Sequence, residues 1–262
     1  MLKRGISALI VLCLLTTYIV CVPAAASGET KVTLNKKIKY NAGKTKISWK
    51  VDGEEPESCA LTYQMVDSST VPQSRIRWEG ITKHSFETGD LIPGKKYEVI
   101  LWGPFNSVLA RRTYSVPETE EFADGKLKAS SVRITVEPVK MKSGGNPRKD
   151  AKKTGMLKAA EIIDSIKNGN TEYGVKYTMK MPRLDKARTV FVTIVFESPD
   201  GYMFVEKSED LTFLRAVSSY DFIGYRFFYF MFMERQEVPA GTYKINLFWD
   251  GMKVGTQTFK VK

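Results

Sequence analysis

Two copies of one short pattern, one in each half of the chain, constrain the fold most. The first runs from Leu91 through Pro93-Gly94 to Tyr97 and ends at Trp102. The second runs from Val238 through Pro239-Ala-Gly241 to Tyr243 and ends at Trp249. Each copy joins a proline–glycine turn to an alternating strand that opens on a tyrosine, and one more alternating segment follows. The repeat therefore predicts two antiparallel β-sandwiches, each with this pattern as its penultimate strand.

Short alternating segments with turn signals every 8 to 12 residues fill the first half and predict about seven strands. In the segment 45–51, Ile47, Trp49 and Val51 share the apolar side. With Trp49, Tyr63 and Leu91-x-Pro-Gly-x-x-Tyr97, residues 30–117 resemble the fibronectin type III module. The resemblance implies that Trp49 fills the core between two sheets and that the Tyr97 hydroxyl bonds to backbone just upstream. The basic and aromatic segment 75–78 departs from that pattern.

The second half, residues 171–262, resembles a divergent immunoglobulin-like sandwich. Ser198-Pro-Asp-Gly201 and Trp249-Asp-Gly251 are hairpin signals. The segment 189–196 is apolar on both faces at several positions. We therefore expect an all-β chain of two tandem antiparallel sandwiches, fibronectin type III-like and then immunoglobulin-like, with one short helix in the joint.

Residues 118–170 form the expected joint. Residues 131–139 alternate, and they are either part of this joint or the first strand of the second sandwich. The following polar stretch, 140–155, is rich in lysine and glycine and predicts a mobile loop, because it has little apolar surface to bury. Residues 156–168 fit a helix with one apolar face, formed by Leu157, Ala160, Ile163 and Ile166.

The first 26 residues have the pattern of a secretory signal peptide. Lys3 and Arg4 precede an apolar run, and Ala24-Ala-Ala26 supplies a small-residue cleavage site. We expect a secreted, extracellular protein, with the cell surface or a periplasm as alternatives, and no membrane span after cleavage. Cleavage would leave Cys59 as the single cysteine, which excludes an intramolecular disulfide. We interpret Cys59 as a small buried hydrophobic residue.

Positive charge points to an anionic partner. Without Lys3 and Arg4, 38 basic residues stand against 29 acidic ones, a net charge of +9. Such a secreted protein associates with wall polymers, acidic glycans or lipid headgroups, unless its basic surface is simply solvated. A nucleic-acid partner is not expected, because no nucleic-acid-binding motif occurs.

No motif for chemistry is found. His84, the single histidine, has no nucleophile or metal ligand placed beside it by a motif, and zinc needs three or four ligands. Phosphate loops and nucleophile elbows are absent. The sequence 52–55 is acidic, but its spacing does not match a calcium loop. We expect no enzyme, no metal and no cofactor.

Binding surfaces are the better candidates. Three groups stand out: the two arginines of the segment 75–78, the aromatic run 222–233 and the lysines of the stretch 140–155. The candidate residues are Arg75, Arg77, Tyr225, Arg226, Phe228, Tyr229, Phe230, Lys149, Lys152 and Lys153. If 222–233 is one strand, both its faces are aromatic, so the second face is covered by the helix or the first sandwich, or binds a partner.

The leading hypothesis is a secreted, non-enzymatic binding or adhesion protein of a cell surface or extracellular matrix. Its partner would be a protein or an anionic surface polymer or glycan. The alternative is a structural or assembly component of an extracellular or periplasmic complex, whose aromatic strand packs on a protein partner. The sequence leaves the oligomeric state open.

Overall fold

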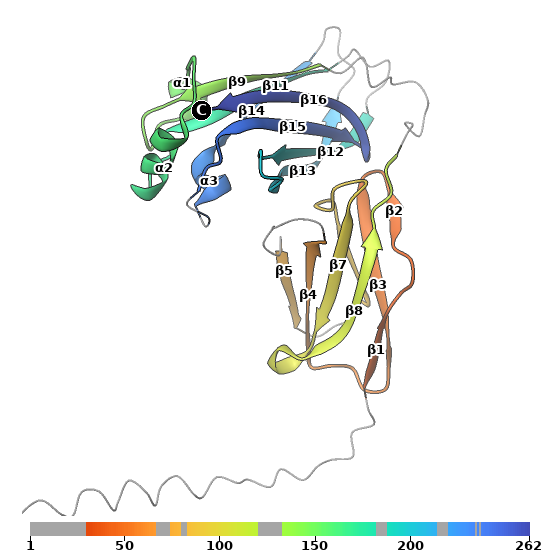
Figure 1. Ribbon diagram of the computed structural model, residues 1–262. Coiled ribbons are helices and arrows are strands. Elements are labelled where there is room, and N and C mark those ends of the chain that lie inside the picture. Colours follow the sequence, from red (N-terminus) through yellow and green to blue (C-terminus); the bar gives the residue numbers. More distant parts are fainter. Residues whose placement is uncertain are drawn as a thin grey trace, which may run out of the picture.

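The computed structural model describes residues 30–66, 74–79, 83–119, 133–181, 188–213, 220–233, 235 and 237–262. The predicted signal peptide lies outside these residues. The described chain is built from antiparallel β-sheets with a few short helices (Figure 1). Within the described residues, no helix is long and apolar enough to cross a membrane.

The first sandwich has two sheets. In one sheet, strand β3 (Lys44–Asp52) pairs with β1 (Lys31–Leu34), β2 (Lys39–Asn41) and β6 (Ser85–Thr88). The other sheet has the order β5 (Ser74–Glu79), β4 (Ser58–Met65), β7 (Lys96–Trp102) and β8 (Val108–Ser115). A 3-10 turn, η1 (Pro104–Asn106), joins its last two strands. Trp49 is 3% exposed and lies in the cluster between the sheets, as predicted.

The second sandwich repeats this plan. One sheet has the order β10 (Lys152–Lys153), β9 (Arg133–Lys140), β11 (Tyr173–Met181) and β14 (Tyr220–Phe227). The other has the order β13 (Met203–Phe213), β12 (Arg188–Glu197), β15 (Gly241–Trp249) and β16 (Met252–Val261). Strands β9, β11 and β14 correspond to β1, β3 and β6, and β13-β12-β15-β16 corresponds to β5-β4-β7-β8. Both repeated patterns therefore occupy the penultimate strand, as predicted.

The two tyrosines that open these strands are buried and bonded to backbone upstream. The Tyr97 hydroxyl accepts a hydrogen bond from the Ile92 backbone N–H at 2.9 Å. The Tyr243 hydroxyl donates to the Pro239 carbonyl at 2.9 Å. Gly94 supplies the positive φ, +77°, that its turn requires. The same pattern thus fixes the entry to β7 and to β15.

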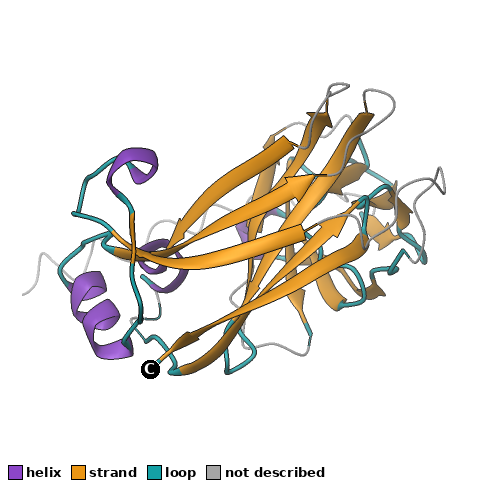
Figure 2. Cartoon of the chain, turned by 90° about the horizontal axis from the view of Figure 1, so that it is seen from above, coloured by secondary structure: helices purple, strands orange, loops and turns teal. Residues whose placement is uncertain are grey.

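An inserted segment between β9 and β11 carries helix α1 (Pro147–Asp150), strand β10 and helix α2 (Ala159–Lys167). The helices lie at one end of the second sandwich (Figures 1 and 2). The stretch 140–155, expected to be a mobile loop, instead contains regular elements. Composition was misleading here because local hydrogen bonds and the pairing of β10 with β9 organise the segment without a large apolar core.

Helix α2 is shorter than predicted, and its buried face agrees only in part with the predicted one. It begins at Ala159 and ends before Gly169, whose φ is +70°. Its buried apolar residues are Ile162 and Ile166, whereas Ala160 is exposed. Leu157 precedes the helix and bridges to Val261 of β16 instead. Ile163 is partly buried and packs against the core, so the observed face overlaps the predicted one at Ile163 and Ile166.

The aromatic run 222–233 is not one strand, which corrects the predicted alternation. Strand β14 ends at Phe227, and residues Phe228–Phe232 form the short helix α3. Phe228, Met231 and Phe232 are buried in the core of the second sandwich. Because these residues are three and four positions apart, a helical turn places them on one face, and that face is the buried one. Because every position from Phe227 to Met233 is apolar or aromatic, alternation could not show where the strand stopped.

Candidate functional site

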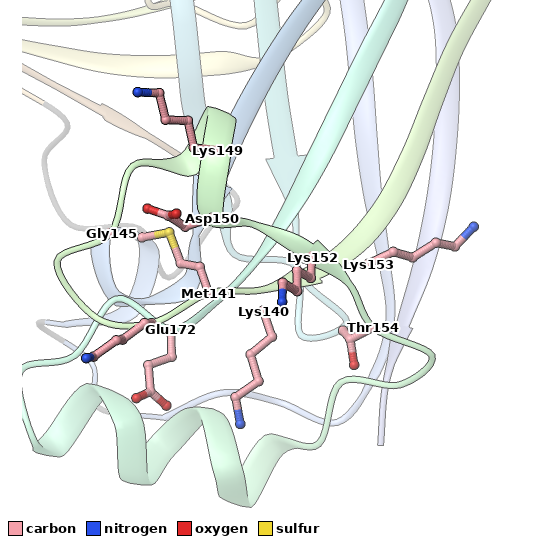
Figure 3. A pocket seen from close by; sticks show the side chains of 10 residues that line it. Lys140, Met141, Gly145, Lys149, Asp150, Lys152, Lys153, Thr154 and Glu172 are labelled. Carbon is pink, nitrogen blue, oxygen red and sulfur yellow. The ribbon is translucent and has the colours of Figure 1, made fainter.

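A strongly charged concavity lies where the inserted segment meets β9 and the residues just before β11 (Figure 3). Its volume is about 730 Å³. We call it the basic pocket, and its lining is Lys140, Met141, Lys142, Gly145, Lys149, Asp150, Lys152, Lys153, Thr154 and Glu172. Five of these ten residues are lysines and two are carboxylates, so the pocket carries a net positive charge.

Local hydrogen bonds build one wall of the basic pocket. The Asn146 side chain accepts from the Arg148 N–H at 3.0 Å and caps α1, with Pro147 in the first turn. The Asp150 carboxylate accepts from the Asn146 N–H at 2.6 Å. Because Asp150 is engaged in this way, it braces the turn that carries Lys149.

Strand pairing places two lysines against each other in the opposite wall. Lys152 of β10 stands directly across from Lys140 of β9 in the antiparallel register. Side chains at such opposed positions lie about 5 Å apart at their Cβ atoms, and like charges there are destabilising. Both side chains are exposed and both line the basic pocket. The fold therefore tolerates a repulsive pair at this site, which a bound anion would relieve.

A hydrogen-bonded network holds Lys140 in place. Its ammonium donates to the Tyr173 hydroxyl at 2.7 Å and lies 4.6 Å from the centre of the Tyr173 ring. Tyr173 donates in turn to Glu161 of α2 at 3.1 Å, and Lys158 pairs with the same carboxylate at 2.8 Å. The bond to Tyr173 raises the pKa of Lys140, so this ammonium is charged at neutral pH. The bonds from Lys158 and Tyr173 lower the pKa of Glu161.

The remaining lysines differ in how they are paired. Lys153 pairs with Glu137 at 3.2 Å and points away from the pocket (Figure 3). Lys142, Lys149 and Lys152 have no carboxylate partner among the residues that the structure describes. These three exposed ammonium groups are the ones free to contact a ligand.

The sequence identified part of this site. Lys149, Lys152 and Lys153 were candidates, and the structure brings all three to one pocket. Lys140 and Lys142 were missed as candidates, although they lie in the same basic stretch. Their position in the pocket follows from the register of β10 on β9. That register depends on where the chain turns, and composition does not show it.

The aromatic candidates behave differently from one another. Phe228 is 0% exposed and belongs to the core, so it is not part of a binding surface, and that expectation was wrong. The Arg226 guanidinium lies 4.3 Å from the Phe204 ring centre and 5.5 Å from that of Phe230. Tyr225 and Tyr229 are half-buried. Of this set, only Phe230 is largely exposed, at 48%.

Arg75 and Arg77 lie on β5, but their side chains are outside the part of the chain that the structure describes. His84 lies beside Glu55, with its Nε2 2.8 Å from the carboxylate. No group of three or more histidine, cysteine, aspartate or glutamate side chains that could hold a metal ion occurs within the described ranges. Cys59 is buried, as predicted.

No protein-family model and no curated protein matches the chain. Among solved structures, a segment of two fibronectin type III domains from chicken tenascin is 10% identical, with a TM-score of 0.26. That match covers 88% of this chain and 98% of the tenascin segment. Domains FN1–FN3 of chicken CNTN1 are 8% identical, with a TM-score of 0.24, over 89% of this chain and 66% of theirs.

A β-glycosidase from Bacteroides vulgatus is 9% identical, with a TM-score of 0.22. It overlaps 89% of this chain but only 24% of its own length. Matches at these TM-scores say nothing about function. The fold is instead defined by the chain's own sheet order and by its two tyrosine-anchored strands.

Proposed function

We propose that the protein is a secreted, non-enzymatic binding protein of two fibronectin type III-like sandwiches that acts at a cell surface or in an extracellular matrix. Its partner is an anionic surface polymer or glycan, and the basic pocket is the binding site. One observation carries the proposal. Lys140 and Lys152 face each other across a strand pair beside Lys142 and Lys149, and the described residues offer Lys142, Lys149 and Lys152 no carboxylate partner.

The choice of cation indicates how the partner is recognised. The lining of the basic pocket contains lysines and no arginine. An ammonium acts as a compact point charge, whereas a guanidinium recognises a carboxylate or phosphate through a planar pair of hydrogen bonds. The pocket is therefore suited to charge density along a polymer more than to the shape of one anionic group.

Retention of the protein on intact cells or isolated cell walls, measured across a salt series, tests this function. Exposed charges are screened over about 10 Å at 0.1 M salt, so retention should be strong at low ionic strength and fall steadily as salt rises. Columns bearing phosphate or carboxylate groups at equal density should show the same trend. Absence of retention at every salt concentration would contradict the proposal.

A second candidate function, assembly with a protein partner, is favoured by exposed apolar side chains near α3. Phe230 in α3 and Met233 directly after it are 48% and 46% exposed. Large exposed apolar side chains in one region are a mark of interaction surfaces. Light scattering discriminates here: an oligomer that is lost in Phe230→Ser, with both sandwiches still folded, supports assembly. A monomer in the unmodified protein argues against self-assembly.

A further inference from the structure

Strand β12 is apolar on both faces, and only one face belongs to the core of its own sandwich. Val190, Val192, Ile194 and Phe196 lie in that core. Phe191 and Val195 alternate with them and so lie on the opposite, outer face of the sheet. Both are nevertheless buried, at 6% and 1% exposure, and Phe248 on the neighbouring strand β15 is 5% exposed. Something outside the second sandwich must cover this face.

The first sandwich provides the cover. Val195 and Phe248 belong to the same cluster of buried side chains as the core of the first sandwich, which includes Ile47 and Trp49. Met203 and Val205 of β13 pack against this cluster as well. The outer face of β12, β13 and β15 is therefore continuous with the end of the first sandwich (Figure 1).

Two tight turns meet at this contact, each with two consecutive residues of positive φ. Ala42 and Gly43 form the turn between β2 and β3, and Asp250 and Gly251 form the turn between β15 and β16. A Cβ on Gly43 would lie 2.8 Å from the Phe191 ring and 3.0 Å from the Gly251 nitrogen. A Cβ on Gly251 would overlap the Tyr40 hydroxyl. The turns thus approach too closely for any larger side chain.

An ion pair lies at the same junction. The Lys44 ammonium is 2.6 Å from the Asp210 carboxylate of β13 and 5.0 Å from the centre of the Phe191 ring. Lys44 follows the Ala42–Gly43 turn directly, so a single hairpin of the first sandwich supplies both the apolar and the charged contact.

We propose that the outer face of β12 and β15 is a docking surface for the end of the first sandwich, and that the two sandwiches move as one rigid body. Neighbouring domains in one chain otherwise move relative to each other by default. The docking explains why a strand of the second sandwich is apolar on both faces. It also holds the basic pocket, at the helical end of the second sandwich, at a fixed distance from the first sandwich. This proposal does not depend on what the pocket binds.

Amide ¹⁵N relaxation of the full chain tests the proposal, because it reports how fast each sandwich tumbles. A rigid body gives one rotational correlation time for the amides of both sandwiches. Two different, shorter correlation times in the unmodified protein would overturn the proposal.

A variant at the junction sharpens the test. Val195→Asp places a carboxylate in the docking surface but leaves the core-facing side of β12 unchanged. We expect the correlation time of each sandwich to fall by a factor of about two, since each then carries about half the mass and moves independently. The matched control is Thr258→Asp, on an exposed position of the same sheet, which should leave the single correlation time intact.

An unchanged correlation time in a well-folded Val195→Asp protein would overturn the proposal. If this variant unfolds the second sandwich, Tyr40→Asp alters the junction from the other side, on the half-buried edge hairpin of the first sandwich. Faster tumbling of two folded sandwiches in Tyr40→Asp supports docking, and an unchanged correlation time refutes it.

Discussion

At the scale of single residues, Tyr97 and Tyr243 occupy equivalent positions but bond in opposite senses. Tyr97 accepts from an N–H, and Tyr243 donates to a carbonyl. The resemblance of the sequence to the fibronectin type III module implied that the Tyr97 hydroxyl would bond to backbone just upstream. It did not predict the sense of either bond, since a phenolic hydroxyl can do both.

Removing the two hydroxyls should therefore have unequal effects. Tyr97→Phe leaves the N–H of Ile92, a residue only 2% exposed, without its partner, which should lower the free energy of unfolding by about 1–3 kcal/mol. Tyr243→Phe removes one donor from a carbonyl that has a second lone pair, and about 0.5–1.5 kcal/mol is expected. Urea unfolding measures both.

Tyr225→Phe is the control, because no hydrogen bond of its hydroxyl occurs among the described residues, and its effect should stay within about 0.5 kcal/mol. Equal effects of all three substitutions would show that the tyrosine hydroxyls do not anchor the strands.

Cys59 supplies a prediction about pH. Burial, and secondarily the charge of Glu55, raise the pKa of its thiol to about 11 from 9.0. The folded state thus favours the neutral thiol, and this contribution to stability is complete below pH 9 and lost as pH rises through 11. Since the thiolate is the reactive form, Cys59 should react slowly with a thiol reagent at pH 8 and rapidly after unfolding in urea.

This measurement uses a chain without residues 1–26, so that Cys13 and Cys21 do not contribute. Fast labelling of the folded protein at pH 8 would contradict burial of the thiol.

At the scale of elements, most strands could be predicted, but helix α3 and the order of the basic segment could not. Alternation located strands such as β3 and β7 because only one face of each is buried. The extent of α3 was hidden because Phe228, Met231 and Phe232 satisfy a helical period inside an aromatic run. The order in the basic segment was hidden because it comes from the pairing of β10 with β9, a contact that composition does not encode.

The opposed lysines of β9 and β10 allow stability and binding to be separated. Lys152→Glu replaces the repulsion with Lys140 by an attraction across the strand pair, which should raise the free energy of unfolding by about 0.2–1 kcal/mol. The same change should weaken retention on a polyanion, because it removes one of the three unpaired ammonium groups. Urea unfolding and column retention measure the two effects.

Lys176→Glu is a useful comparison, since Lys176 pairs with Glu137 at 3.7 Å and lies outside the pocket lining. It should lower the stability slightly. A Lys152→Glu protein that is less stable than the unmodified protein would argue that the opposed lysines do not repel each other.

At the scale of the whole molecule, the two-sandwich plan was readable because the anchoring pattern occurs twice. The assignment of residues 133–140 to the second sandwich required the pairing of β9 with β11. The apolar outer face of β12 was visible in the sequence, but its cover was not, because the contact joins residues about 150 positions apart, such as Gly43 and Phe191. The net charge predicted an anionic partner without saying where the charge was concentrated.

Comparing two triple variants on a polyanion column tests most directly that the basic pocket is the binding site. Lys142, Lys149 and Lys152 are replaced by glutamine in one, and the exposed Lys31, Lys46 and Lys50 of the first sandwich in the other. Both lose three positive charges, so a diffuse electrostatic effect would act on them equally. We predict that the pocket variant elutes at clearly lower salt than the control variant, which should stay close to the unmodified protein. Elution of both variants at the same salt concentration would contradict a localised site.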